Sequence, residues 1–278
     1  MIRSILSGVS GMRAHQVRMD VIGDNIANVN TTGYKASRTS FQTTLSQTLK
    51  AGGGGRNPAQ VGTGMSLSGI YANFEQGALQ STGRALDIAI EGNGFFKLQD
   101  PNSGEYYFTR DGSFFIDTNG YIVNASGLRL CDDTGTGVLQ IQMIDPGTGN
   151  NLTIEYIQIA DNGEVTGQVV DTGTGNASPL TFATGSGTIG LANFPNPNGL
   201  LKAGQTLYRY NSIAGTEVNG APKSNGLGTL NSGYLEMSNV DLTDEFATMI
   251  TTQRGYQANA RVITVSDTLL EELIQLKR

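Results

Sequence analysis

The sequence predicts an α+β protein in which an N-terminal and a C-terminal helix pair as a coiled-coil-like core module around an all-β body. Three observations predict this class. Apolar residues recur every seven positions near both ends of the chain, and strand-like runs with turn residues fill the middle. Glycine accounts for 38 of 278 residues, about twice its usual share. Glycine-rich linkers are therefore expected to join the helices to the body.

The first predicted helix spans residues 2–28. Its apolar stripe consists of Ile5, Val9, Met12, Met19 and Ile26. This a/d spacing is typical of a helix that buries a narrow stripe against another helix. The Asn-, Thr- and Gly-containing residues 25–35 favour caps and turns, so the helix should end near residues 28–30.

The second predicted helix spans residues 241–278. Its apolar stripe consists of Leu242, Phe246, Met249, Tyr256, Ile263, Leu270 and Ile274. Asp241 fits an N-cap, Asp244 and Glu245 place negative charge in the first turn, and Lys277 and Arg278 place positive charge in the last. The two stripes pack either on each other within one chain or on copies of the chain, and the spacing fits both.

Composition predicts the domain organisation. Residues 1–50 and 233–278 are expected to form a discontinuous helical module, and residues 65–210 the β body. Residues 51–64 and 211–232 are expected to be linkers.

Local signals predict the course of the chain within these parts. Residues 36–50 fit a short helix or an extended arm. Asp111-Gly112, Asn119-Gly120 and residues 161–164 separate strand-like runs and predict hairpin turns. Residues 191–204, which contain two prolines, are expected to form a loop.

Composition also excludes several functions. The formal charge is -6 and the pI is about 4.8, and no Lys/Arg run occurs, which argues against nucleic-acid binding. One cysteine, Cys131, excludes a disulfide framework, and one histidine, His15, weakens a histidine metal site or a Ser-His hydrolase. No apolar run is long enough for a membrane span, and no secretory signal is present. On composition alone the protein is expected in the cytoplasm.

Short motifs for chemistry are incomplete. Gly52–Gly55 lacks the Gly-Lys-Ser/Thr ending of a phosphate loop and is interpreted as a flexible joint. Residues 111–112 and 161–164 lack the alternating oxygen ligands of a calcium loop. The acidic pair Asp132-Asp133 has no matching acid elsewhere. The sequence therefore predicts no cofactor, no metal and no enzymatic activity.

Specific segments resemble a known family. Residues 7–13 (Ser-Gly-Val-Ser-Gly-Met-Arg) and 19–35 resemble the N-terminal signature of bacterial flagellar rod and hook proteins. Residues 77–96 and 109–114 are similar to the first body strands of that family, and residues 232–246, 253–258 and 266–273 to its C-terminal part. The signature loop then comprises Asn25, Asn28, Asn30, Gly33 and Tyr34.

The resemblance implies a structural subunit that is located in the hook or basal body of the flagellum. Such proteins leave the cell through the flagellar type III export apparatus without a cleaved signal, which replaces the cytoplasmic expectation, and polymerise into a helical tube. The nearest likeness is to short hook proteins, on residues 57–62 and 273–278, and the alternative is the distal rod. The hook is a flexible universal joint that transmits torque from rod to filament. The implied partners are copies of the chain, a rod protein below, a hook–filament junction protein above and the hook cap.

Overall fold

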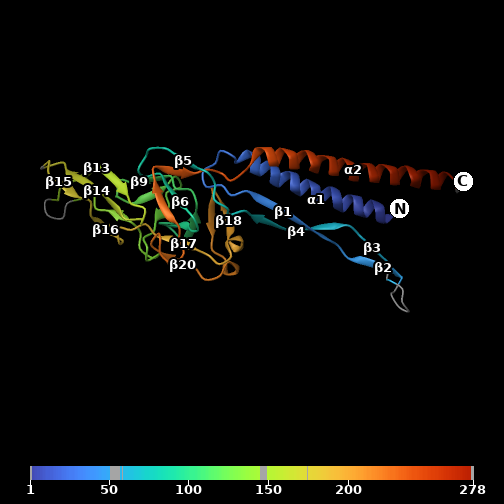
Figure 1. Ribbon diagram of the computed structural model, residues 1–278, viewed down its shortest axis with the longest axis horizontal. Coiled ribbons are helices and arrows are strands. Elements are labelled where there is room, and N and C mark those ends of the chain that lie inside the picture. The colour runs from blue at the N-terminus through green and yellow to red at the C-terminus, as the bar shows by residue number, and fades with distance from the viewer. Residues whose placement is uncertain (1, 51–56, 58, 145–148, 174, 277–278) are drawn as a thin grey trace. The chain divides into compact units, whose positions relative to one another are not determined.

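The computed structural model of the chain describes residues 2–50, 57, 59–144, 149–173 and 175–276 (Figure 1). The chain forms two compact units. Unit 1 comprises Met1–Val29, Lys35–Asn73 and Val240–Arg278, and unit 2 comprises Asn30–Tyr34 and Phe74–Asn239. The expected joint Gly52–Gly55 and the basic residues Lys277 and Arg278 lie outside the described residues.

Unit 1 contains two long helices, α1 (Ile2–Ala27) and α2 (Leu242–Gln275), which run antiparallel side by side (Figure 1). Asp241 caps α2, because its carboxylate accepts hydrogen bonds from the backbone N–H groups of Thr243 (2.8 Å) and Asp244 (3.5 Å). The predicted cap of α2 is therefore confirmed. The last residue of α1 is Ala27, directly before the predicted end at residues 28–30. Neither helix that the structure describes is apolar enough over its length to cross a membrane.

A long two-stranded ribbon completes unit 1 (Figure 1). β1 (Ser37–Thr43) pairs antiparallel with β4 (Met65–Ala72), and β2 (Ser46–Lys50) pairs antiparallel with β3 (Ala59–Gly62). Of the two forms expected for residues 36–50, the structure has the extended one. The ribbon packs on α1, where the Ser10 hydroxyl accepts a hydrogen bond from the Met65 N–H (3.3 Å).

Unit 2 is built on a nine-stranded antiparallel sheet. Its main path runs in the order β18 (Leu201–Gly204), β19 (Leu207–Arg209), β8 (Tyr106–Thr109), β7 (Phe95–Gln99), β11 (Arg129–Leu130), β10 (Ile122–Asn124) and β9 (Phe114–Ile116). The two remaining strands are β17 (Leu191–Asn193), which pairs with β7, and β20 (Val218–Gly220), which pairs with β17.

Smaller sheets and short helices surround the main sheet. The two-stranded sheets are β5 (Leu79–Ser81) with β22 (Tyr234–Glu236), β6 (Ile88–Glu91) with β21 (Thr229–Ser232), and β12 (Gln140–Ile141) with β16 (Phe182–Thr184). A three-stranded sheet contains β13 (Leu152–Ile159), β14 (Val165–Asp171) and β15 (Ala177–Pro179). The 3-10 helices are η1 (Pro197–Gly199) and η2 (Ser212–Ala214).

The core of unit 2 consists of two apolar clusters. Because successive side chains of a strand point to opposite faces of the sheet, β7 contributes to both. Phe96 and Leu98 belong to the larger cluster, and Phe95 belongs to the smaller, aromatic one. Both faces of β7 are therefore covered, and its residues Phe95 to Leu98 are all buried.

The turn predictions have mixed outcomes. Asn119-Gly120 joins β9 to β10 and residues 161–164 join β13 to β14, so both predicted hairpins are confirmed. The hairpin predicted at Asp111-Gly112 is not formed. The strand before it, β8, pairs with β7 and β19 and not with β9, the strand after it. The carbonyl of Gly112 instead accepts a hydrogen bond from the Ile88 N–H (3.0 Å), and a Cβ atom at Gly112 would lie 1.6 Å from the Ile88 oxygen.

The prediction of a loop at residues 191–204 is also wrong. This segment contains β17, η1 and β18. β17 forms hydrogen bonds with β7 on one side and β20 on the other. This pairing between distant segments overrides the local proline and glycine signals.

Candidate functional site

The helix pair of unit 1 is held along a line of small and polar residues. A Cβ atom on Gly8 would lie 3.1 Å from Cγ1 of Ile263, and one on Gly11 would lie 2.6 Å from Nδ2 of Asn259. One on Gly255 of α2 would lie 2.8 Å from Nε2 of His15. Small side chains at these positions let the two backbones approach closely.

Hydrogen bonds extend the same contact line toward its ends. The hydroxyl groups of Ser4 and Ser266 lie 3.2 Å apart. At the other end, the Asn25 side-chain amide donates to the Glu245 carboxylate (2.8 Å). The contact line therefore differs from the apolar stripe expected from the sequence, because glycine, serine and amide side chains occupy most of it.

The residues of the two predicted stripes are only partly covered within unit 1. Half-buried members are Ile5, Val9, Met12, Met19, Ile26, Met249, Ile263 and Leu270. Exposed members are Leu242, Phe246, Tyr256 and Ile274. Ile263 is the member that the contacts described above place directly on the α1–α2 line.

Further apolar residues of α2, absent from the predicted stripe, are also exposed. They are Ile250, Val262, Val265, Leu269, Leu273 and Leu276. Val262, Leu269 and Leu276 lie seven apart. The seven-residue spacing could therefore have identified this second apolar line on α2. A helix with exposed apolar residues on more than one side can bury them against additional helices.

The signature loop begins with a buried amide in unit 1. Asn25 is 1% exposed. Its side chain donates to the Ser37 carbonyl (2.9 Å) and accepts from the Ser37 N–H (2.8 Å), as a strand neighbour would. With its bond to Glu245, Asn25 ties α1 to the start of β1 and to α2. Asn28 donates to the Asp24 carbonyl (2.9 Å) at the end of α1, and Asn30 is exposed.

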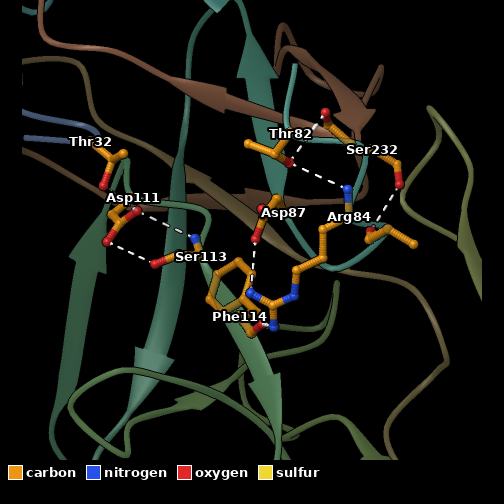
Figure 2. A network of polar contacts seen from close by, with 10 residues as sticks. Thr32, Thr82, Arg84, Asp87, Asp111, Ser113, Phe114 and Ser232 are labelled. Atoms are coloured by element: carbon orange, nitrogen blue, oxygen red, sulfur yellow. Dashed lines mark hydrogen bonds and ion pairs between the residues drawn. The ribbon is translucent and has the colours of Figure 1, made fainter. Parts of the chain in front are cut away.

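The rest of the loop belongs to unit 2. Gly33 has φ of +66° and donates from its N–H to the Glu236 carbonyl (2.8 Å). A Cβ atom there would lie 2.5 Å from the Asp111 nitrogen. Figure 2 shows Thr32 donating to the Asp111 carboxylate (2.9 Å). Tyr34 is buried, with the Lys202 ammonium 5.4 Å from its ring centre. Both the left-handed backbone and the close approach require glycine at position 33.

A buried ion pair lies next to this loop. Nη1 of Arg110 is 3.5 Å from Oε2 of Glu236, and both side chains are almost fully buried. Arg110 also donates to the Gly92 carbonyl (2.9 Å), and Glu236 accepts from the Gly77 N–H (2.9 Å). Burial lowers the pKa of Arg110, and the Glu236 carboxylate partly opposes that shift. The pair joins four segments that are distant in sequence.

A second polar network fixes the sheet edge at β9. Arg84 donates to the Phe114 carbonyl (2.5 Å) and to the Asp87 carboxylate (3.2 Å), as Figure 2 shows. Its guanidinium lies 4.3 Å from the centre of the Phe115 ring. Arg84 thus satisfies a backbone acceptor that an edge strand would otherwise expose.

The single cysteine and the single histidine of the sequence pack within the fold. Cys131 is buried, and burial raises the pKa of its thiol to about 12, which leaves it unreactive. His15 lies in the helix contact, where burial and then the Arg18 charge lower the pKa of its imidazole. In the described part of the chain, no three His, Cys, Asp or Glu side chains gather as metal ligands would.

Family models match three parts of the chain. The model described as flagella basal body rod protein matches residues 5–35. The model for the D1 domain of the flagellar hook protein FlgE/F/G matches residues 89–167, and that for the flagellar basal body rod FlgEFG protein C-terminal matches residues 231–276.

Whole proteins are similar as well. The flagellar basal-body rod protein FlgG of Bacillus subtilis is 42% identical over 285 residues, with both chains covered completely. The FlgG protein of Borreliella burgdorferi is 37% identical over 288 residues, again with both chains covered completely. The flagellar hook protein FlgE of the same organism is 30% identical over 444 residues.

These alignments favour the distal rod over the hook, although residues 57–62 and 273–278 had suggested a hook protein. The alignment to the hook protein spans 444 residues, whereas the alignment to the B. subtilis rod protein spans 285. The hook alignment therefore contains long segments that this chain lacks. The chain belongs to the family of bacterial flagellar rod and hook proteins.

Proposed function

We propose that this chain is the subunit of the distal rod of the flagellum, and that its copies assemble into a helical tube through α1 and α2. The full-length likeness to rod proteins, at 42% and 37% identity, supports the rod. A hook subunit is the second candidate, because a hook protein aligns with the whole chain at 30% identity.

The exposed apolar residues of α2 carry the proposal of self-assembly. Phe246 and Val265 are 48% and 58% exposed, although α1 lies beside the helix. Burial contributes about 0.8 kcal/mol for each methylene removed from water. Neighbouring copies that cover these residues and the half-buried residues of α1 would therefore stabilise the assembly by many such contributions.

The remaining features of the proposal follow from the family resemblance. Other axial proteins are expected at the two ends of the tube, and the type III export apparatus is expected to deliver the subunit. Residues 211–232 contain η2, β20 and β21 of unit 2, and residues 59–62 form β3 of unit 1. The chain passes between the units after Val29, Tyr34, Asn73 and Asn239, and we propose that adjustment between the helical module and the β body takes place at these crossings.

The test is to place a charge in the proposed helix interface. Phe246→Asp should prevent rod assembly, because neighbouring copies would have to desolvate a carboxylate at a cost of several kcal/mol. Gln257→Asp, at an exposed polar position of the same helix, is the matched control. Rods are counted by electron microscopy of basal bodies from cells that produce each variant. Normal rods with Phe246→Asp would contradict the proposed interface.

The choice between rod and hook needs a separate experiment. In cells that lack this chain, a distal-rod function predicts basal bodies with truncated rods. A hook function predicts complete rods without hooks. Electron microscopy of purified basal bodies distinguishes the two outcomes.

A further inference from the structure

The contact line between α1 and α2 accepts more than one register. Gly8 and Gly11 lie three residues apart on α1, so a shift of one helical turn places Ile263 over Gly11, whereas it now lies over Gly8. The hydroxyl groups of Ser4 and Ser266, which lie 3.2 Å apart, can rotate toward other partners. Small side chains therefore let the helices approach closely without fixing which residues face each other.

The middle of the contact line also accepts this shift. Gly255 would move from His15 to Met19, so a larger side chain would again lie over a glycine. The same shift brings His15 opposite Asn259, and these two polar side chains can share a hydrogen bond. A helix pair with such a line needs a further feature to select one register.

Asn25 provides a contact with a fixed direction. Its side chain is 1% exposed. Oδ1 accepts from the Ser37 N–H (2.8 Å), and Nδ2 donates to the Ser37 carbonyl (2.9 Å). Because one backbone residue holds both ends of the amide, the amide plane cannot rotate. The Nδ2 group also donates to the Glu245 carboxylate of α2, 2.8 Å away, and a hydrogen bond to a carboxylate is stronger than one between neutral groups.

A shift of one turn would break this contact. It brings Met249 to the place of Glu245, and a thioether is only a weak acceptor. The buried Nδ2 group would lose its carboxylate, and a buried donor that loses its partner destabilises the fold. The shifted register is therefore disfavoured at Asn25, although the glycine-containing line accepts it.

We propose that Asn25 is the positioning residue that selects the register of α2 on α1. It acts through Glu245, and its bonds to Ser37 set the direction in which it acts. Buried amides select one register among several in coiled coils. A shift of one turn would displace the exposed apolar residues of α2 by about 5.4 Å along α1. Copies with different registers would then not match in the proposed tube, and this consequence alone rests on the proposed function.

Disulfide formation within one chain reports the register. Ser4→Cys with Ser266→Cys places two thiols where the hydroxyl groups lie 3.2 Å apart. Ser4→Cys with Leu270→Cys reports the shifted register, in which position 270 faces position 4. Cys131 stays in place, because it is buried and its thiol pKa is raised to about 12. Both free chains are oxidised at low concentration, where links within one chain dominate, and the links are quantified by peptide mass spectrometry. The ratio of the 4–266 link to the 4–270 link counts only molecules whose helices are paired.

The main variant is Asn25→Leu, introduced into both cysteine chains. The ratio should fall about tenfold or more, because a hydrogen bond to a charged group commonly contributes at least that factor. Ile22→Val is the matched control, since Ile22 lies one turn earlier on α1 and is 3% exposed; it weakens packing without removing a hydrogen bond and should leave the ratio unchanged. An unchanged ratio with Asn25→Leu, or an equal fall with Ile22→Val, would overturn the proposal. Loss of both links with Asn25→Leu would also overturn it, because Asn25 would then hold the helices together without selecting their register.

A pair of changes tests the bond between Asn25 and Glu245 directly. Asn25→Asp sets two carboxylates against each other and should lower the ratio as Asn25→Leu does. Adding Glu245→Gln lets an amide on α2 donate to the carboxylate at position 25, and should restore most of the ratio. A ratio that stays low in the double variant would overturn the proposed role of this bond.

Rod counts by electron microscopy then test the consequence for assembly. Asn25→Leu should reduce the number of assembled rods, and Ile22→Val should not. Normal rods together with a shifted ratio would contradict the consequence for the tube and support the register role. Absence of rods even with the unaltered chain would contradict the proposed function, whereas the link ratio of the free chain would still test the register.

Discussion

The contact between α1 and α2 and the core of unit 2 are built from opposite kinds of residues. Gly8, Gly11 and Gly255 occupy the helix contact, whereas Phe96, Phe114 and similar large side chains fill the β core. Unit 2 thus gathers most of its large apolar residues in an internal core, although a few, such as Ile144 and Ile213, are exposed. Unit 1 leaves many of its own on the surface of α2. We therefore predict that unit 2 is stable by itself and that unit 1 gains much of its stability from contacts with further copies of the chain.

The largest effect is expected from removing one partner of the buried ion pair in unit 2. Glu236→Ala leaves Arg110 charged and buried, which should lower the free energy of unfolding by about 3–5 kcal/mol. Urea unfolding followed by tyrosine fluorescence measures this change, since the chain has ten tyrosines and no tryptophan. Glu105→Ala removes a surface partner of Arg209 and should cost less than about 1 kcal/mol. Equal effects of the two variants would show that the Arg110–Glu236 pair does not hold the unit together.

A smaller but more direct difference should appear in amide hydrogen exchange of the free chain. An isolated helix is costly to nucleate, and most helical stability comes from tertiary packing. We therefore expect residues 9–26 and 246–273 to exchange at least ~30-fold faster than residues 86–130, which is a difference of about 2 kcal/mol in opening free energy. Ordering of the helices would then be coupled to assembly.

Exchange measured on the assembled rod is the control. Residues 9–26 and 246–273 should become as protected there as the β core. Protection of both helices in the free chain equal to that of residues 86–130 would show that unit 1 is stable without neighbours.

Local signals predicted the parts of the fold that local interactions determine. Asp241 was recognisable as a cap because its side chain bonds the adjacent backbone. The turns at Asn119-Gly120 and 161–164 were recognisable because glycine adopts a positive φ there, as at Gly120 (82°) and Gly163 (85°). Pairings such as β6 with β21 join segments far apart in sequence, and no local pattern specifies them.

The helix contact was difficult to predict for a different reason. The seven-residue template counts apolar residues, so it found the stripe at Met12 and Met19. It could not find a line that contains Gly11, His15 and Asn259. The Asp111-Gly112 signal was misread because Asp111 binds Thr32 and Gly112 approaches Ile88. Both contacts depend on residues that are distant in sequence.

The smallest expected effect is the pH dependence of the helix contact. His15 is the only histidine, and burial, followed by the Arg18 charge, lowers the pKa of its imidazole below 6.5. A lowered pKa means that the folded helix pair favours neutral His15. This contribution to stability is fully present above pH 6.5, and it is lost as the pH falls through the lower pKa of the folded state. Protonation would place a charge beside Gly255 in the contact line.

Assembled rods should therefore lose helix protection slightly between pH 7 and pH 5 in the unaltered chain, since histidine titrates in this range. His15→Gln cannot titrate there and should show a weaker pH dependence, with the same behaviour at pH 7. Amide exchange of residues 9–26 at both pH values measures the difference, and residues 86–130 in the same sample report any general effect of acid. An identical pH response in the two proteins would exclude His15 as its source. A response confined to residues 9–26 and abolished by His15→Gln would show that His15 makes the α1–α2 contact sensitive to pH, in contrast to the core of unit 2.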